Sequence, residues 1–271
     1  MPEWLQVTRG DAPLIVSMPH TGTDIPADIE ARLTSPWMAR KDADWNIEKL
    51  YDFASSTGAT TVRTTVSRTV IDVNRDPNGA SLYPGQTTTE LCPTTTFDGE
   101  PLYRDQCELD TEEIPARSAL YFIPYHAAIG ATIARLRGTH AKLVLFEAHS
   151  IRSVIPRLFE GELPNFNIGT NSGASCDPAL AAEIEAVCQN TKFSCVTNGR
   201  FKGGWTTRHY GKPANGVHAI QLELACRGYM DEPREVSPDN WPTPYDETRA
   251  AEMRAALRNI LQACLTFAST P

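Results

Sequence analysis

Residues that can carry out hydrolytic chemistry follow short apolar segments at several places in this 271-residue sequence. His20 and His149 each come directly after such a segment, and Glu223 lies near the end of another. Two histidines and a carboxylate, with water in the fourth position, form a common hydrolytic zinc site. The ion lowers the pKa of its water to about 7, and a separate carboxylate can accept the proton. This set of residues therefore indicates a metal-dependent hydrolase.

The acidic member of such a site could be Asp42 or Asp44, which stand together in the segment DADW at the start of a predicted helix. Carboxylates at this position also cap helices and interact favourably with the positive end of the helix dipole, and the spacing alone favours capping. A single histidine at a strand end is also more often a hydrogen-bonded structural residue than a ligand. Residue types alone therefore leave the choice between the two aspartates open.

Side chains that could bind a carboxylate flank another predicted strand. Asn74 and Arg75 come directly after it, and Arg68 comes directly before it. A guanidinium group can bind a carboxylate through two parallel hydrogen bonds. The alternative is that these arginines form structural ion pairs with Asp72 or Asp76. The two interpretations differ in whether the guanidinium groups face a substrate or a buried aspartate.

The elements that must position these residues are short apolar strands that alternate with amphipathic helices. Predicted strands cover residues 14–18, 59–66, 69–73, 142–148, 193–197 and 217–224. Predicted helices cover residues 44–55, 123–137, 178–188 and 246–265. This alternation is typical of an α/β fold with a mixed, largely parallel sheet sandwiched between helices. In such sheets ligands bind beyond the carboxyl ends of the strands, which is where the candidate residues stand.

A long segment over residues 76–115, rich in Pro, Gly and Thr, is the only candidate for a linker. Its aromatic residues Tyr83, Phe97 and Tyr103 favour an ordered excursion over the sheet instead. The sequence contains no internal repeat, low-complexity tract or charge block. We therefore expect a single catalytic domain over residues 1–271.

Composition and charge argue against several classes of protein. The chain has 25 Lys and Arg against 33 Asp and Glu, a net charge of −8, and no basic run, so nucleic acid is not an expected partner. No segment approaches the roughly 18 consecutive apolar residues of a membrane-spanning helix, and the N-terminus lacks the pattern of a signal peptide. The seven cysteines are scattered without a CxxC pair. We expect reduced thiols in a cytoplasmic protein with no membrane partner.

Several short motifs occur together between residues 19 and 224. They are PHTG (19–22), DADW (42–45), SR (67–68), DVNR (72–75), FEAHSIR (146–152), FKGG (201–204), TRHYG (207–211) and QLEL (221–224). Through the order and number of these motifs, the sequence resembles the N-formylglutamate amidohydrolase family of histidine breakdown. The resemblance covers most of the chain and implies a fold similar to that of zinc-dependent exopeptidases of the carboxypeptidase type.

The resemblance also implies a metal site. It assigns a divalent metal, with zinc as the expected ion, to His20, His149 and an acidic residue. Asp44 is the expected acidic ligand. The His-x-x-Glu spacing of the carboxypeptidases is absent here, so Asp42 and Asp24 stay as alternatives.

The remaining roles concern the substrate. By resemblance, Glu223 is the general base, Asn74 and Arg75 bind a carboxylate, and Arg75 or Arg68 helps to stabilise the oxyanion. Arg208 and His209 are candidates for binding the side-chain carboxylate.

The implied reaction is the metal-dependent hydrolysis of a small dicarboxylate, N-formyl-L-glutamate, to formate and L-glutamate. The alternatives are a zinc deacylase or carboxypeptidase-like enzyme for another acidic N-acyl amino acid, and a non-catalytic carboxylate-binding sensor.

Overall fold

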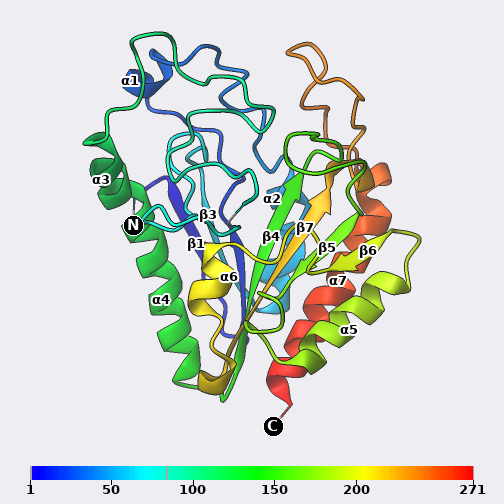
Figure 1. The fold of residues 1–271 in the computed structure, drawn as a ribbon. Helices are drawn as coiled ribbons and strands as arrows, with labels where there is room; N and C mark the ends of the chain where they lie inside the picture. The colour runs from blue at the N-terminus through cyan, green and yellow to red at the C-terminus, as the bar shows by residue number, and fades with distance from the viewer. Residues whose placement is uncertain (1, 84, 271) are drawn as a thin grey trace.

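A seven-stranded β-sheet forms the centre of the molecule (Figure 1). Its strands are β1 (Leu5–Thr8), β2 (Leu14–Met18), β3 (Thr60–Thr64), β4 (Leu143–Ile151), β5 (Phe166–Gly169), β6 (Cys195–Thr197) and β7 (Val217–Ala225). The computed structural model describes residues 2–83 and 85–270. The strand order is β1-β3-β2-β4-β7-β5-β6. The four central strands β3, β2, β4 and β7 are parallel to one another. β1 pairs antiparallel with β3, β5 pairs antiparallel with β7, and β6 is parallel to β5. This mixed, largely parallel sheet confirms the predicted fold class.

Helices cover both faces of the sheet (Figure 1). One face carries α3 (Glu113–Arg117), a π-helical turn (Ser118–Phe122), α4 (Ile123–Arg137) and α6 (Trp205–Tyr210). The other carries α2 (Ile47–Leu50), α5 (Pro178–Gln189) and α7 (Glu247–Ser269). The remaining helical segments are α1 (Ala27–Glu30) and three 3₁₀ turns, Asp52–Thr57, Pro213–Asn215 and Cys226–Gly228.

The central strands are buried on both sides, which explains their nearly continuous apolar sequences. In β4, Leu143 and Leu145 pack towards α4, whereas Val144 and Phe146 pack towards α5 and α7. Successive side chains of a strand point to opposite faces, so one short strand contributes to both hydrophobic clusters. The sheet is therefore fixed from both sides, and its carboxyl ends are rigid positions for functional side chains.

Most of the predicted elements are present. The helix over residues 123–137 has the predicted bounds, and α5 begins with Asp177 accepting a hydrogen bond from the backbone N–H of Ala179. The predicted helix over residues 44–55 is wrong in its extent, because Asn46 adopts a left-handed conformation (φ 61°) and the segment divides into α2 and a 3₁₀ turn. The alternation pattern missed β1, β5 and α6, which are only four to six residues long.

The predicted strand over residues 69–73 is wrong. This segment is buried but irregular, and its backbone is satisfied by turns and by a side chain. The N–H of Val70 donates to the carbonyl of Ser67, and the N–H of Asn74 donates to the carboxylate of Asp72. A buried aspartate therefore organises this segment where a strand would have used a neighbouring strand.

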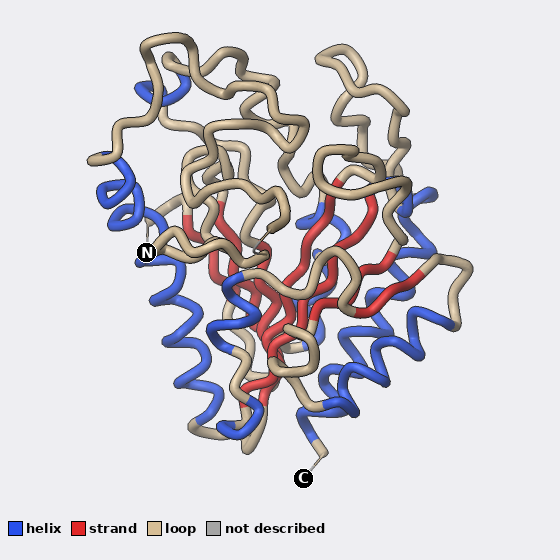
Figure 2. Tube along the Cα trace, viewed as in Figure 1, coloured by secondary structure: helices blue, strands red, loops and turns tan. Residues whose placement is uncertain are grey.

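Long loops, tan in Figure 2, gather at the end of the sheet where Figure 1 shows the arrowheads of β4 and β7. The segment over residues 76–115 belongs to them, and its side chains Phe97 and Tyr103 are buried. All seven cysteines of the described residues are free, and five of them are buried. Within residues 2–83 and 85–270, no helix has the length and apolarity that a membrane crossing requires. The loops at the carboxyl end thus cover the edge where a ligand of an α/β sheet is expected.

Candidate active site

Three neighbouring parallel strands bring together the residues that the sequence pattern pointed to. His20 follows β2, His149 lies in β4, and Glu223 lies in β7 directly opposite His149 in the strand register. All three side chains are buried. Because parallel strands end at the same edge of the sheet, residues more than 200 positions apart in the sequence lie in one pocket.

His20, Asp44 and His149 form a cluster that could hold a metal ion, with one ligand atom from each residue and all of these atoms within 4.8 Å of one another. The Asp44 Oδ2 atom lies 3.0 Å from His149 Nδ1 and 3.7 Å from His20 Nδ1. His20 Nδ1 and Asp44 Oδ1 are buried and have no hydrogen-bond partner within the described residues. Buried polar atoms normally find partners, and a cation at this position would satisfy both. The donor set fits a hydrolytic metal site.

The three candidate aspartates have different surroundings. Asp44 is buried beside both histidines, and its backbone N–H donates to the carbonyl of His20. Asp42 instead accepts hydrogen bonds from the N–H of Phe97 and from Arg152. Asp24 is exposed. The geometry therefore groups Asp44 with the histidines, and Asp44 makes no side-chain cap at the start of α2.

Asp72 orients His20. Its Oδ1 atom lies 2.6 Å from His20 Nε2, and its Oδ2 atom accepts a hydrogen bond of 2.6 Å from Arg68. A carboxylate on the far nitrogen of a histidine fixes the tautomer and turns the other nitrogen towards a metal. Burial lowers the pKa of His20, and the charge of Arg68 acts in the same direction, so the ring is neutral, as a metal ligand must be.

Burial alone would raise the pKa of Asp72, but the charges of His20, Arg68 and Arg75 outweigh it and hold this pKa well below its usual range. The Arg75 Nε atom lies 3.5 Å from Asp72 Oδ2. Asp72 is therefore a permanent carboxylate shared between the candidate ligand and two arginines.

His149 is held from both of its nitrogens. Its Nδ1 atom faces Asp44, and its Nε2 atom lies 3.1 Å from the side-chain nitrogen of Asn74 and 3.8 Å from Glu147. Burial would lower the pKa of His149, but the carboxylates of Asp44 and Glu147 outweigh it and raise this pKa well above its usual value. These carboxylates therefore favour a cation at the ring, so metal binding would compete with protonation of the ligating nitrogen.

Glu147 is a fully buried carboxylate with no lysine or arginine partner among the described residues. It accepts hydrogen bonds of 3.3 Å from the hydroxyl groups of Ser17 and Thr207. Its Oε2 atom lies 3.8 Å from His149 Nε2, so Glu147 lies behind that ring.

Glu223 has the properties of a residue that exchanges protons near neutral pH. Burial raises its pKa to about 7, with Asp44 adding to the rise, while the charges of His149, Arg68 and Arg75 partly offset it. The side-chain nitrogen of Gln221 donates to its Oε2 atom at 3.1 Å. A carboxylate with a pKa near the working pH can both accept and return a proton.

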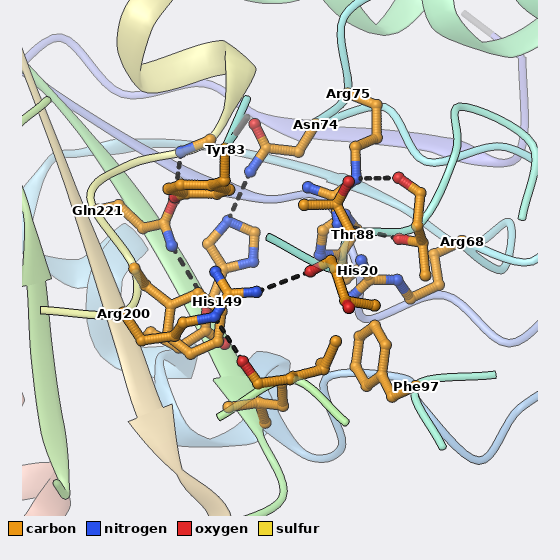
Figure 3. Close-up of a pocket in the computed structure, with 17 residues that line it drawn as sticks. His20, Arg68, Asn74, Arg75, Tyr83, Thr88, Phe97, His149, Arg200 and Gln221 are labelled. Carbon is orange, nitrogen blue, oxygen red and sulfur yellow. Dashed lines mark hydrogen bonds between the residues drawn. The ribbon is translucent and has the colours of Figure 1, made fainter. Parts of the chain in front are cut away.

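The pocket beside these residues is lined by three arginines, Arg68, Arg75 and Arg200, and by Asn74, Tyr83, Phe97 and Gln221 (Figure 3). The amide of Asn74 also accepts a hydrogen bond from the N–H of Thr206 in α6, so it links that helix to His149. Guanidinium groups around a candidate metal site give a small basic pocket inside a chain of net negative charge.

The structure does not place Arg208 and His209 in the pocket lining. The Arg208 guanidinium lies over the Tyr83 ring, and its Nε atom donates to the carbonyl of Gly203. His209 is exposed and stacks on Trp205 with the ring centres 4.1 Å apart. Both residues belong to α6, a helix that the sequence pattern missed.

Sequence reasoning also missed Arg200 and Tyr83 as lining residues and Asp72 as the partner of His20. Asp72 was considered only as an ion-pair partner of an arginine. Arg200 stands directly before the FKGG motif, which was the only local indication of its position. None of these three residues follows a predicted strand that ends at the site.

The comparisons with known proteins agree with each other. The family model for N-formylglutamate amidohydrolase matches residues 12–230. The chain is 47% identical to an N-formylglutamate deformylase of Pseudomonas aeruginosa over 98% of both chains. It is 43% identical to one of Pseudomonas putida, over 98% of this chain and 97% of that protein. The fold resembles the crystal structure of an N-formylglutamate amidohydrolase from Ralstonia eutropha JMP134, with a TM-score of 0.77 and 24% identity over 97% of this chain and 96% of that one.

Proposed function

We propose that this chain, which belongs to the N-formylglutamate amidohydrolase family, hydrolyses N-formyl-L-glutamate to formate and L-glutamate, a reaction of histidine degradation. One observation carries the proposal beyond family membership. A cluster of two histidines and an aspartate lies beside a buried glutamate of raised pKa, in a pocket whose wall contains three guanidinium groups. This arrangement suits the hydrolysis of an amide in a substrate with two carboxylates.

His20, Asp44 and His149 would hold a divalent metal, and zinc is the ion that we propose for this donor set. When bound, such an ion lowers the pKa of water and polarises a carbonyl group. Asp72 and Asn74 keep the two histidine rings in position through their far nitrogens. The buried surroundings exclude bulk water from this end of the pocket and strengthen each electrostatic interaction in it.

Glu223 is the general base of the proposed reaction. It takes a proton from the attacking water as the new carbon–oxygen bond forms at the formyl carbon. It then gives this proton to the nitrogen as the carbon–nitrogen bond breaks, which releases formate and the amine of L-glutamate. The buried position of Glu223 keeps its pKa near neutral, so both transfers are accessible at the same pH.

Arg68 and Arg75 bind the negative charge of the substrate near the reacting group. The Arg68 Nη1 atom lies 3.7 Å from Asp44, a proposed metal ligand, and Arg75 adjoins Asp72, the carboxylate that holds His20. Arg68 is buried and stabilises charge that develops on the formyl oxygen. Arg75 is more exposed to the pocket, and with Asn74 it binds the carboxylate that adjoins the scissile amide.

The test is the release of formate from N-formyl-L-glutamate by the purified protein, with and without a chelator. We expect activity that is lost with the chelator and restored by zinc, cobalt or manganese. His149→Ala is expected to lose both bound metal and activity, whereas His140→Ala, which changes a histidine outside the pocket, keeps both. Full activity of a metal-free protein would contradict the metal mechanism.

N-acetyl- and N-carbamoyl-L-glutamate test the acyl group. We expect formate release to be the fastest reaction, because the pocket next to the ligands is small and enclosed by Phe97 and Ile151. Faster hydrolysis of the acetyl compound would indicate a deacylase and contradict the proposed substrate.

A further inference from the structure

Arg200 differs from the other two arginines of the pocket wall. Arg68 and Arg75 both have Asp72 as an ionic partner, whereas Arg200 has no carboxylate partner among the described residues. Its Nε atom donates to the carbonyl of Leu158 at 2.7 Å, and its Nη2 atom donates to the carbonyl of Thr87 at 2.8 Å. Its Nη1 atom is buried and has no hydrogen-bond partner in the described part of the chain. Of the three guanidinium groups in the pocket lining, only this one thus forms no ion pair within the described residues.

Two aromatic rings hold this guanidinium in place. Its central carbon lies 5.2 Å from the ring centre of Tyr83 and 5.2 Å from that of Phe201. The Tyr83 hydroxyl in turn donates to the carbonyl of Gly203 and accepts from the N–H of Lys202. Contacts with aromatic faces and neutral carbonyls orient a guanidinium without neutralising it. Arg200 is therefore positioned in advance for an anion that comes from outside the protein.

Without a bound anion, the positive charge of Arg200 in this buried position is unfavourable, and an anion in the pocket would stabilise it. Burial lowers the pKa of Arg200, and the positive charge of Arg75 acts in the same direction, whereas Tyr83 and the carboxylate of Glu223 partly offset the fall. Figure 3 shows the two side chains reaching the pocket from different sides. Two cations facing one small pocket favour a ligand with two separate negative charges.

We propose that Arg200 binds the side-chain carboxylate of the substrate and thereby sets the preference of the enzyme for a dicarboxylate. The assignment follows from position: Arg75 contacts Asp72, the carboxylate that holds His20, and with Asn74 it belongs to the segment that holds both proposed histidine ligands, so we place the carboxylate next to the scissile amide beside it. Arg200 is the remaining cation for the carboxylate at the end of the side chain. This inference rests on the proposed function.

The test compares N-formyl-L-glutamate with N-formyl-L-glutamine, which differs by the absence of the side-chain charge. In the wild-type enzyme we expect kcat/KM to favour the glutamate compound. In Arg200→Gln, the ratio of kcat/KM for the glutamate compound to kcat/KM for the glutamine compound is expected to fall by about 10- to 100-fold, the usual range for a charged hydrogen bond. The fall should come from loss of activity on the glutamate compound alone. In Arg75→Gln both substrates are expected to lose activity by similar factors, so the ratio is kept. An unchanged ratio in Arg200→Gln, or a collapsed ratio in Arg75→Gln, overturns the assignment.

Arg208→Gln is the matched comparison, because Arg208 also lies over the Tyr83 ring, at 5.0 Å, but outside the pocket lining. If this substitution, rather than Arg200→Gln, lowers the ratio, the sequence-based candidate is correct and the present inference fails. Arg200→Lys keeps the charge without the planar fork and is expected to retain part of the ratio, which separates lost binding from a folding defect.

Binding of the reaction product gives a readout that does not need turnover. Calorimetry is expected to show that wild-type protein binds L-glutamate more tightly than L-glutamine, and that Arg200→Gln binds both alike. If the wild-type protein releases no formate, the proposed function fails, and this binding comparison still decides the role of Arg200. If formate is released but Arg200→Gln keeps its preference, only the role of Arg200 fails.

Discussion

Each histidine of the candidate metal site is fixed by a second residue, and both of these second residues come from a segment outside the sheet. Asp72 holds His20, and Asn74 holds His149. Both lie in the irregular segment that follows β3. The segment thus aligns two ligands that belong to different strands. Its sequence, DVNR, supplies a carboxylate, an amide and a guanidinium within four positions.

The first residue-scale prediction concerns Asp72. We expect Asp72→Asn to lower metal affinity by about 10- to 100-fold, the usual effect of removing the hydrogen-bond partner of a metal-bound histidine. Asp76→Asn is the control, because Asp76 contacts the nearby N–H of Asn78 and no candidate ligand. Titration with zinc in a competing chelator measures the affinity. Equal affinities in the two variants would show that Asp72 does not orient His20.

The second concerns the pH dependence of the reaction. Glu223 must be deprotonated to act as a base, and burial raises its pKa to about 7 without a bound cation, so kcat/KM is expected to rise along an acidic limb with an inflection no higher than about 7 and then level off. A bound cation favours the carboxylate and moves this inflection to lower pH. Glu223→Gln should keep the metal, lose about 10²- to 10⁴-fold in kcat and lose the acidic limb. An acidic limb that persists in Glu223→Gln would belong to another group.

The sequence allowed the residues at strand ends to be predicted because the strands are short, apolar and unambiguous. His20, His149 and Glu223 were found in this way, and the structure brings them together. Arg200 and Tyr83 lie in loops and meet only in the folded chain, so no local pattern marked them. Long-range contacts between loops carry no periodicity, and periodicity was the main evidence available.

At the scale of elements, the close approach of α6 to the segment after β3 decides how Asn74 is held. The N–H of Gly204 donates to Gln221, and the N–H of Thr206 donates to Asn74. A Cβ atom on Gly204 would lie 2.3 Å from the Asn74 side-chain nitrogen. Only glycine allows this backbone to approach so closely.

We therefore expect Gly204→Ala to displace Asn74, to destabilise the protein by about 1–3 kcal/mol and to reduce kcat/KM. Gly130→Ala in α4 is the control, since its Cβ meets nothing within 4 Å and alanine favours a helix. Chemical unfolding and formate release measure the two effects. Normal activity of Gly204→Ala would mean that the position of Asn74 does not matter to the reaction.

His126 links α4 to the same segment. Its Nε2 atom lies 2.7 Å from the carbonyl of Val73, and its ring is surrounded by Phe122, Trp205 and Tyr210. Burial lowers its pKa to about 4, whereas a histidine in the unfolded chain has a pKa near 6.5. Between these values the unfolded state binds more protons, so the free energy of unfolding falls as the pH falls from 6.5 to 4.

The lowered pKa of His126 predicts that this residue alone lowers the free energy of unfolding by about 3 kcal/mol as the pH falls from 6.5 to 4. His126→Gln keeps a donor for Val73 but does not titrate. Urea unfolding at a series of pH values should therefore give a shallower slope for the variant than for wild type between pH 6.5 and 4. Parallel slopes would show that His126 does not carry the effect.

Helices and strands with a long apolar periodicity were predicted well from the sequence. Segments in which side chains replace hydrogen bonds between backbone groups were predicted poorly. α4, α5, α7, β4 and β7 all have near-predicted bounds. The segment 69–73 has the composition of a strand, but turns and the side chain of Asp72 supply hydrogen bonds there. The left-handed conformation of Asn46 delays the start of the helix that the apolar spacing predicted from residue 44. A conformation that depends on one side chain is not visible in an average over a window of residues.

At the scale of the whole molecule, the sheet separates two hydrophobic clusters, and the active site lies at its edge. Leu257 of α7 is fully buried in the cluster away from α4 and does not line the pocket. The single-domain organisation over residues 1–271 stays a prediction. The net charge of −8 describes the surface and does not describe the pocket, whose lining contains three arginines.

We expect Leu257→Ala to lower the free energy of unfolding by about 2–5 kcal/mol, because it leaves a cavity in a packed core. Leu257→Met preserves the volume and is expected to cost less than about 1.5 kcal/mol. Both variants should keep the wild-type kcat at a temperature where they are folded. A reduced kcat in folded Leu257→Ala would show that the core on this face influences the site.

The placement of Tyr83, Thr87 and Arg200 in loops has a consequence for how such an enzyme can diversify. The proposed metal ligands and the base are carried by the sheet and its immediate extensions, whereas the residues proposed to recognise the far carboxylate are not. Loops accept substitutions and insertions that strands between two packed layers do not. A descendant of this chain could therefore acquire a different acid as substrate by changes in two loops, with its bond-breaking machinery inherited intact.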